Sequence, residues 1–361
     1  MNDDPFWRGR RVVVTGHTGF KGGWLTLYLQ CLGAKVTGYS LSPQTSPCLF
    51  ESADVARGMV SVIGDVRDLS SLIACFEETA PEVVFHLAAQ PIVRRSYEDP
   101  VETFSTNVLG TVHVLESVRR TSGVRAVVVV TSDKCYENKE WPWAYRESDR
   151  LGGFDPYSSS KAGAELVTLA YRRSFFNAAP GDRPRVCVAS ARAGNVIGGG
   201  DWAHDRLLPD IIRAISSNDT LMIRNPNSTR PWQHVLESIS GYLLLAAALV
   251  ERGPSFADAW NFGPGDRDAL SVRELVEGFA ASWGPGVRWA LSKEEHPHEA
   301  QALRVDSAKA RTVLGWKPRL NVREALRWTS EWYKAWCDGR PMRDFTIGQI
   351  REYWQGGVRE S

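Results

Sequence analysis

Residues 12–23 read VVVTGHTGFKGG. An apolar run ends at the first of the glycines Gly16, Gly19 and Gly22, which recur at every third position. A strand, a glycine turn and a helix start together hold a dinucleotide pyrophosphate. Glycine lets the backbone approach the ligand, and the helix N-terminus offers free N–H groups. The stretch therefore predicts the first strand and helix of a dinucleotide-binding domain.

The alternation of apolar runs with helical patterns continues outward from this turn. Strands are expected at residues 11–15, 35–39, 59–63, 82–86, 126–130 and 186–191. Helices are expected to begin near Phe20, Asp68, Pro100 and Pro156. Apolar strands that alternate with helices predict a parallel sheet covered on both faces. Right-handed crossovers make this a doubly wound, Rossmann-type α/β fold.

The texture of the chain changes after about residue 190, where glycine and proline become frequent and tryptophan accumulates. We expect residues 1–190 to form a dinucleotide-binding Rossmann domain. Residues 191–361 are expected to form mainly a smaller C-terminal substrate-binding lobe, discontinuous, with some segments returning to the Rossmann domain. Trp328, Trp332 and Trp336 recur every four residues, which favours a packed helix face or a subunit contact over a ligand site.

The bulk properties exclude several classes of function. The formal net charge is +1 and no long run of like charge occurs, which argues against nucleic acid or an anionic membrane as a partner. No apolar stretch approaches the ~20 residues of a membrane span, and no apolar signal region opens the chain. The 6 cysteines form no CxxC pair and the 7 histidines no HExxH, so we expect a reduced, cytoplasmic protein without a metal site.

Further candidate cofactor contacts follow the ends of the expected strands. Asp65 is placed to reach the adenine edge or, alternatively, to cap the next helix. Asn107, in a later helix, favours a structural or water-holding role. Ser40 stands where a carboxylate would select NAD over NADP, so the residues alone leave that choice open. The candidates are Gly16, Thr18, Gly19, Phe20, Gly22, Ser40, Asp65, Val66, Leu87, Ala88, Ala89, Asn107, Tyr157 and Lys161.

A second pair of stretches carries the chemistry: TSDKCYEN at residues 131–138 and DPYSSSKAGAE at residues 155–165. Tyr157 and Lys161 lie four residues apart at an expected helix start and so share one face. The charge of Lys161 stabilises a phenolate and is expected to bring the pKa of Tyr157 towards the working range. Ser132 can hydrogen-bond the substrate oxygen. This set predicts removal of a proton from an alcohol during hydride transfer.

These motifs resemble the extended short-chain dehydrogenase/reductase superfamily, and within it the CDP-glucose 4,6-dehydratases. The shared stretches are TGHTGFKGGWL, TSDKCYEN, DPYSSSKAGAELV, ARAGNVIGGGDW, RPWQHV, WNFGP and LGWKP, which span nearly the whole chain. The resemblance implies an intramolecular redox elimination. NAD+ takes hydride from sugar C4, water leaves across C5 and C6, and hydride returns to C6. The implied product is CDP-4-keto-6-deoxy-glucose, for deoxysugar biosynthesis, with no net consumption of NAD.

Asp133 and Lys134 suit the elimination step. Oxidation at C4 acidifies the C5 proton, and loss of water then needs a base at C5 and an acid for the C6 hydroxyl. The two residues follow Ser132 directly and can supply both groups. Relatives that act on dTDP-glucose carry Asp-Glu here, so Lys134 either acts as the C5 base, when neutral, or only holds the geometry. The alternative for both residues is an ordinary turn.

The substrate diphosphate needs positive charge and backbone donors. The resemblance places several residues at the nucleotide, with the Asn195 amide on the pyrophosphate, although each arginine is alternatively an ordinary ion-pair residue. We also expect the glycine run at 198–200 to let the backbone approach the ligand. The choice of cytosine, and so of CDP-glucose, rests on the resemblance. The candidates are Arg192, Asn195, Arg206, Arg230, His298 and Glu299.

Two other functions compete with the dehydratase. A nucleotide-sugar 4-epimerase or reductase needs the serine, tyrosine and lysine but no elimination pair, and an NAD(P)-sensing protein typically loses the tyrosine and lysine. The residues present favour the dehydratase. The superfamily commonly pairs two helices between subunits, and the helices expected from Pro100 and Pro156 carry apolar residues on more than one face. We therefore expect a homodimer or homotetramer.

Overall fold

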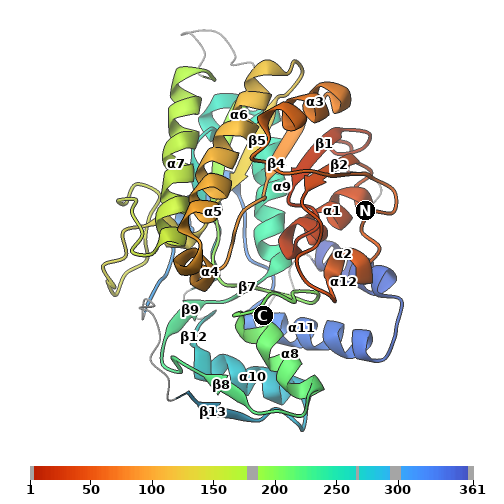
Figure 1. Ribbon diagram of the computed structural model, residues 1–361, viewed down its shortest axis with the longest axis vertical. Helices are drawn as coiled ribbons and strands as arrows, with labels where there is room; N and C mark the ends of the chain where they lie inside the picture. Colours follow the sequence, from red (N-terminus) through yellow and green to blue (C-terminus); the bar gives the residue numbers. More distant parts are fainter. Residues whose placement is uncertain (1–3, 177–185, 266–267, 293–301, 357–361) are drawn as a thin grey trace.

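The computed structural model describes residues 4–176, 186–265, 268–292 and 302–356. Its centre is a seven-stranded sheet in the order β11-β6-β5-β4-β1-β2-β3, with neighbouring strands parallel (Figure 1). Because the chain order reverses between β1 and β4, the doubly wound Rossmann-type sheet is confirmed. The strands are β1 (Arg11–Thr15), β2 (Lys35–Ser40), β3 (Val60–Ile63), β4 (Val83–His86), β5 (Ala126–Val130), β6 (Cys187–Arg192) and β11 (Ala259–Asn261).

The sequence predicts six of these strands to within one residue at each end. The exception is β11, which has three residues. A segment of that length shows no periodicity that would separate a strand from a loop. It reaches the sheet edge by pairing with the end of β6, where Trp260 lies opposite Ala191.

Helices cover both faces of the sheet because successive side chains of a strand point to opposite sides. Val13 and Val84 pack into one core with residues of α3, α6 and α7, while Val12 and Phe85 pack into the other with residues of α1, α9 and α11. The helices are α1 (Phe20–Cys31), α2 (Leu49–Ser52), α3 (Leu69–Thr79), α4 (Val93–Glu98), α5 (Pro100–Phe104), α6 (Gly110–Arg120), α7 (Pro156–Ser174), α8 (Leu207–Ser216), α9 (Val235–Glu251), α10 (Val272–Trp283), α11 (Val322–Cys337) and α12 (Met342–Gln355).

Capping aspartates decide where three of these helices begin. Asp68 precedes α3, Asp99 precedes α5 and Asp155 precedes α7, and each side chain accepts a hydrogen bond from a backbone N–H of the first turn. Proline follows the cap in α5 and α7, where its missing N–H has no helical partner to lose. The cap on α7 fixes the start of the helix that carries Tyr157 and Lys161.

A smaller lobe lies beyond the carboxyl ends of the strands (Figure 1). It contains α8, α10 and two short two-stranded sheets, β8–β13 and β9–β12, while β7 pairs with β10 at its junction with the large sheet. Helix α9 and strand β11 come from the second half of the chain but pack on or in the large sheet. The short strands are β7 (Val196–Ile197), β8 (Leu221–Ile223), β9 (Thr229–Pro231), β10 (Gln233–His234), β12 (Ala269–Ser271) and β13 (Trp289–Leu291).

The tryptophans on one face of α11 pack against the rest of the protein, as the sequence favours. Trp328 and Trp332 are buried, and Trp332 lies against the backbone of Gly199. A Cβ on Gly199 would come within 1.9 Å of the Trp332 ring, so this glycine is needed for close packing rather than for approach to a ligand. This corrects the expectation for the middle of the 198–200 run, whereas Gly198 and Gly200 do line the large cavity described below.

Within the part of the chain that the structure describes, no helix is long and apolar enough to cross a membrane. The same residues contain no group of histidine, cysteine, aspartate and glutamate side chains that could hold a metal ion. The six cysteines are unpaired.

Candidate active site

A cavity of about 740 Å³ opens at the carboxyl ends of the strands, between the sheet and the lobe. Residues from both parts line it, which is the usual place for a ligand in a doubly wound fold. Of the predicted cofactor contacts other than the catalytic pair, those that line it are Gly16, Thr18, Gly19, Phe20, Gly22, Ser40, Asp65, Val66, Leu87, Ala88 and Ala89.

The glycine turn needs its glycines for packing as well as for access. Gly16 has φ of 79°, and a Cβ there would come within 2.7 Å of the backbone nitrogen of Ala88. A Cβ on Gly22 would come within 2.0 Å of the Gly16 carbonyl oxygen. A Cβ on Gly19 would find that oxygen at 3.4 Å and no closer atom. Backbone at Gly19 therefore faces the open cavity, at the N-terminus of α1 where an anion is favoured.

Three other cofactor candidates already have protein partners. Thr18 donates a hydrogen bond to the carbonyl of Leu41 and accepts one from Ser40, which ties the glycine turn to the end of β2. The Asp65 carboxylate is held by Arg67, whose hydrogen bonds and charge keep the pKa of Asp65 below its usual range despite partial burial. Asp65 does not cap α3, since Asp68 fills that role.

Asn107 has a structural place. Its side-chain oxygen accepts from the backbone N–H of Gln90, and its amide donates to the Gln90 carbonyl and to Ser160. The residue is buried and is not among those that line the cavity. Its prediction as a cofactor contact is therefore corrected, while the structural role expected for it matches this geometry. Asn107 locks the loop after β4 to α7, which carries the tyrosine.

Ser132, Tyr157 and Lys161 meet on the cavity wall and are all buried. The Ser132 hydroxyl donates to Asp133 at 2.9 Å and accepts from the backbone N–H of Lys134 at 3.2 Å. The Lys161 ammonium lies 3.4 Å from the carbonyl oxygen of Val130. Strand β5 and the start of α7 therefore bring together a hydroxyl, a phenol and an amine from distant parts of the sequence.

The pKa of Tyr157 shifts in the opposite direction from the one expected. Burial raises the pKa of Tyr157 to about 12, and a hydrogen bond with Ser132 only partly opposes it. Burial also lowers the pKa of Lys161 to about 8. The expected lowering of the Tyr157 pKa is therefore wrong, because desolvation of the phenolate outweighs the hydrogen bond with Ser132 and the charge of Arg206.

Asp133 is buried and has one oxygen without a hydrogen-bond partner among the described residues. Its other oxygen accepts from Ser132. Gly194 packs directly on this carboxylate, since a Cβ there would come within 1.8 Å of Asp133 Oδ2. Because a buried carboxylate oxygen is costly to leave without a donor, this atom is suited to a ligand hydroxyl in the cavity.

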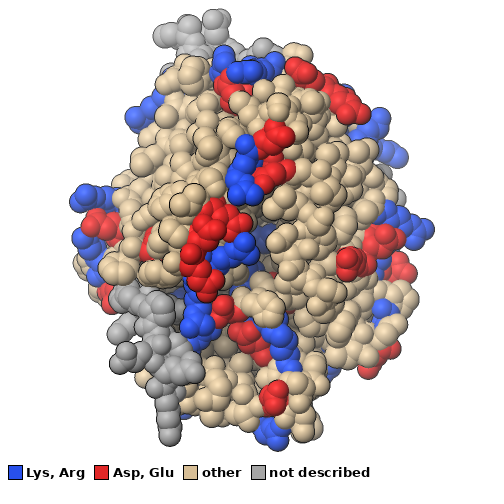
Figure 2. Space-filling model, viewed as in Figure 1, with Lys and Arg blue, Asp and Glu red and all other residues tan. Residues whose placement is uncertain are grey.

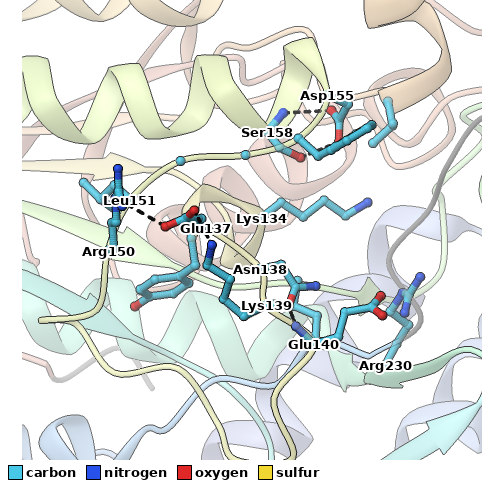
Figure 3. Close-up of a pocket in the computed structure, with 16 residues that line it drawn as sticks. Lys134, Glu137, Asn138, Lys139, Glu140, Arg150, Leu151, Asp155, Ser158 and Arg230 are labelled. Carbon is cyan, nitrogen blue, oxygen red and sulfur yellow. Dashed lines mark hydrogen bonds and ion pairs between the residues drawn. The ribbon is translucent and has the colours of Figure 1, made fainter.

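Lys134 lies on the wall between the large cavity and a neighbouring one of about 480 Å³. Its side chain extends away from Glu137, whose carboxylate pairs instead with Lys139 and Arg150 (Figure 3). No ion pair of the Lys134 ammonium occurs among the residues that the structure describes. Asp133 and Lys134 thus present an acid and an amine beside the Ser132 hydroxyl.

The predicted substrate residues divide into three groups. Asn195, Arg206 and Arg230 line the cavity. Asn195 adopts a left-handed φ of 46° and has a buried side-chain oxygen with no described partner. Arg206 pairs with Asp201 at 2.9 Å. His298 and Glu299 lie outside the described residues.

Arg192 has a different place from the one expected. It is 3% exposed, does not line the cavity, and pairs with Glu165 at 2.8 Å. Its guanidinium also donates to the Tyr136 hydroxyl at 2.8 Å. The side chain of Arg192 at the end of β6 points into the protein, towards α7, rather than towards the cavity. Its prediction as a diphosphate ligand is therefore corrected to a structural one.

Known proteins are similar to this chain over nearly its whole length. A profile of the family "GDP-mannose 4,6 dehydratase" matches residues 13–329. The chain is 52% identical to the CDP-glucose 4,6-dehydratase of Salmonella typhimurium, over 99% of this chain and 100% of that protein. The dTDP-glucose 4,6-dehydratase DesIV of Streptomyces venezuelae, solved with NAD, has a TM-score of 0.77 and 25% identity, over 91% of this chain and 98% of DesIV.

The chain belongs to the GDP-mannose 4,6-dehydratase family of extended short-chain dehydrogenases/reductases. A second solved relative, MoeE5 with UDP-glucuronic acid and NAD, has a TM-score of 0.74 and 28% identity, over 90% of this chain and 98% of MoeE5. Both structural relatives therefore share the sheet and the lobe with this 4,6-dehydratase family member.

Some lining residues of this family member are missed by the sequence interpretation. Lys21 faces the cavity, and burial lowers its pKa to about 7, with repulsion from Arg206 and Lys161 adding to the effect. Trp202 lines the cavity with a buried indole N–H that has no described partner. In the sequence, Lys21 could have been noticed as a charged residue within the glycine turn, at the start of a helix whose other residues are mostly apolar.

Proposed function

We propose that the chain converts CDP-glucose to CDP-4-keto-6-deoxy-glucose and water. The enzyme is an NAD-dependent nucleotide-sugar 4,6-dehydratase, a lyase with no net redox change. The observation that carries the proposal is the pair Asp133 and Lys134 in one cavity with Ser132 and Tyr157. An epimerase or reductase has no use for that pair. The identity of 52% to a CDP-glucose 4,6-dehydratase supports the choice of nucleotide.

The site fits NAD. The glycine turn leaves the backbone at Gly19 open to the cavity, and the N-terminus of α1 points its N–H groups there. Backbone of Leu87 and Ala88 packs beside Gly16 and also lines the cavity, and Asp65, another lining residue, is proposed to contact the adenosine. Bound there, NAD would supply a hydride acceptor for C4 and a hydride donor for C6. The protein supplies the proton transfers around these two events.

Tyr157 takes the proton of the C4 hydroxyl as C4 is oxidised. Burial disfavours the phenolate, and the hydrogen bond with Ser132 and the charge of Arg206 oppose this effect. Lys161 is proposed to add its positive charge when the phenolate forms. Ser132 also hydrogen-bonds the C4 oxygen. Because the product keeps its 4-keto group, Tyr157 does not return this proton to the substrate. The neutral phenol loses the proton to solvent instead.

Asp133 and Lys134 carry out the elimination. The carbonyl at C4 acidifies C5–H, and Lys134 takes or relays that proton. Asp133, which lines the cavity, enters this step as the neutral acid and gives its proton to the C6 hydroxyl, which leaves as water. Lys134 returns a proton to C5, and the bound cofactor would supply the hydride for C6. The O4–H, C4–H, C5–H and C6–O bonds break, and the C4=O, C6–H, new C5–H and water O–H bonds form. The proton that Tyr157 gained from O4 replaces, through solvent, the one that Asp133 gave.

The diphosphate is bound by Arg230 and Asn195. Arg230 lines both cavities, and its guanidinium donates to the Thr229 carbonyl at 3.0 Å. Figure 3 shows it at the edge of the smaller cavity, on the side of the lobe. The Asn195 side chain supplies a neutral hydrogen-bonding group beside it. Arg206 contributes charge that Asp201 partly neutralises.

Incubation of the purified protein with CDP-glucose tests the function. The 4-keto product absorbs in alkali, and mass spectrometry should show loss of 18 Da, the mass of water, without added reductant. UDP-, GDP- and dTDP-glucose serve as parallel substrates and should turn over at least ~10-fold more slowly. Formation of CDP-galactose without loss of water would favour the epimerase instead.

The protein is proposed to act as a cytoplasmic homodimer. Val101, Phe104 and Leu109 on the α5–α6 segment are exposed at 77%, 41% and 46%. Leu166 on α7 and Phe175, which directly follows that helix, are each exposed at 56%. Apolar side chains gathered on two adjacent helices are typical of a subunit contact. Leu115, by contrast, is fully buried in the core beneath. Light scattering at micromolar concentration should give twice the 40.2 kDa chain mass or a multiple of it; a monomer would refute the contact.

A further inference from the structure

Three charged residues meet at the mouth of the large cavity. Arg94 of α4 donates to Asp205 at 3.0 Å, and Arg224 donates to the same carboxylate oxygen at 2.9 Å. All three line the cavity. Hydrogen bonds from the two arginines keep the pKa of Asp205 below its ordinary value, although partial burial opposes this. Asp205 is therefore ionised near neutral pH and joins two guanidinium groups.

The contact links two parts of the molecule that a ligand must pass between. Arg94 follows β4 on the sheet side, whereas Asp205 precedes α8 and Arg224 follows β8, both in the lobe. Charged side chains of both signs gather between the sheet side and the lobe on this face (Figure 2). The three side chains are 24–36% exposed, so the pairs are screened less than a fully solvated pair.

The segment that Asp205 anchors reaches the reacting centre. Asp205 itself has a left-handed φ of 59°, a conformation that aspartate tolerates better than most residues. The next residue, Arg206, lines the cavity, pairs with Asp201, and lies close enough to Tyr157 for its charge to act on the phenol. Movement of Asp205 would carry Arg206 with it.

We propose that Asp205, held by Arg94 and Arg224, is a latch that closes the lobe over the bound nucleotide sugar and positions Arg206. The inference rests on the proposed function. Asp205 and Arg94 are positioning residues, since neither is proposed to touch a reacting atom. With the latch intact the diphosphate is enclosed on both sides, and without it the segment at 203–206 opens and substrate escapes faster. The latch therefore acts on KM more than on kcat.

Arg94→Met, Asp205→Asn and the double variant test the latch against CDP-glucose, at 50 and 300 mM NaCl. Each single change should raise KM by about 3- to 10-fold, the range for a partly exposed ion pair, while kcat changes less than about 2-fold. The double variant should be no worse than Asp205→Asn, because that change already removes the ion pair that Arg94→Met removes. High salt should raise KM of the wild type more than that of the variants.

Arg327→Met and Glu331→Gln provide the matched control. This pair is 2.7 Å apart and exposed on α11, and its loss should leave KM unchanged. KM values that stay at the wild-type level in Arg94→Met and Asp205→Asn, or that multiply in the double variant, would overturn the latch. Hydrogen exchange of the unliganded protein supplies a readout that needs no substrate: amides of residues 203–206 should exchange faster in Arg94→Met.

The two proposals fail in different ways. If the wild type does not turn over CDP-glucose, the proposed function is wrong, and exchange at 203–206 still decides whether Arg94 holds the segment. If the wild type turns over and exchange is the same in every variant, the function stands and the latch is wrong.

Discussion

Two buried acidic side chains beside the end of β5 differ in how their oxygens are hydrogen-bonded. Glu165 on α7 accepts hydrogen bonds from Thr131 at 2.5 Å, Ser190 at 2.7 Å and Arg192 at 2.8 Å. Burial opposes its ionisation, yet Arg192 and these hydroxyls keep the pKa of Glu165 below its usual range. Asp133 accepts from Ser132 alone, and its second oxygen has no described partner.

This difference in hydrogen bonding indicates that Glu165 has a structural role and that Asp133 is available to a ligand, although both lie at the same edge of the sheet. A buried charge whose hydrogen bonds are all made by the protein has nothing left to offer a ligand, and it stabilises the fold only while its partners stay. A buried carboxyl group with an unpartnered oxygen leaves part of its desolvation unmatched and so favours a ligand that completes the missing hydrogen bond. Glu165 belongs to the first kind and Asp133 to the second.

The largest expected effect comes from exchanging the two carboxylates for amides. Glu165→Gln leaves the Arg192 charge buried without its counter-ion, so the free energy of unfolding should fall by about 3–5 kcal/mol. Asp133→Asn should lower it by less than about 1 kcal/mol, since no ion pair is lost. Urea denaturation of both variants measures this. Equal losses of stability would erase the contrast between the two sites.

Tyr157→Phe should leave folding and NAD binding close to wild type. The rate of CDP-glucose turnover should fall by roughly 10²-fold or more, because the group that accepts the C4 proton is gone. Tyr171→Phe, further along α7 and outside the cavity, is the matched control and should turn over normally. Near-normal turnover of Tyr157→Phe would remove this residue from the mechanism.

Asp133→Asn and Lys134→Met should slow elimination more than oxidation. Ser132, Tyr157 and Lys161 remain in place, so hydride still leaves C4, whereas water loss lacks its acid or its base. Stopped-flow absorbance should show NADH that persists before any 6-deoxy product forms, with product formation slower by about 10- to 100-fold.

Lys139→Met on the neighbouring segment is the control for these two variants, since its ammonium pairs with Glu137 away from the large cavity. It should give wild-type kinetics. Solvent deuterium should enter C5 only when elimination or its reversal occurs. Wild-type rates of 6-deoxy product in both active-site variants would make the pair structural.

A third buried carboxylate, Glu237, extends the comparison. The effect expected from changing it is the smallest of those predicted. It accepts from the backbone N–H groups of Arg319 and Leu320 and from the Tyr353 hydroxyl, with no cation bonded to it. Burial raises its pKa to about 7. The folded state therefore binds a proton that the unfolded state has released, and this stability is present below about pH 4.5 and lost as pH rises through about 7.

Glu237→Gln removes that titration. Relative to the wild type, the variant should gain about 2–3 kcal/mol in unfolding free energy between pH 5 and pH 8, from 1.36 kcal/mol per pKa unit. Thermal unfolding across this range measures the difference. An identical pH dependence in both proteins would mean that the hydrogen bonds already hold Glu237 ionised throughout.

Local chemistry explains why much of the site could be predicted. The strand before Gly16, the caps at Asp99 and Asp155, and the spacing of Tyr157 and Lys161 act over a few residues, so their structure follows from neighbours in the chain. The topology of a parallel sheet then brings all strand ends to one edge. These two facts were enough to place the predicted glycine turn and the catalytic set at one cavity.

Side chains whose partners come from distant segments could not be placed in this way. Arg192 looked like a diphosphate ligand, but its direction at the end of β6 depends on Glu165, 27 residues earlier in the chain. Position 199 needs glycine because the Trp332 ring, from a distant segment, packs against its backbone. The pKa of Tyr157 likewise depends on how deeply the lobe buries the phenol.

The sequence by itself determined six strands of the large sheet, the glycine turn and the residue types predicted for catalysis, because propensity and periodicity are local properties. The tertiary structure alone decided which charges are satisfied and which remain open. The sequence singled out Asp133 by its place directly after Ser132, but no local pattern shows that the oxygens of Glu165 are all hydrogen-bonded while one oxygen of Asp133 is not. Their roles differ because burial makes every missing hydrogen bond costly, and only the packed chain determines where the donors lie.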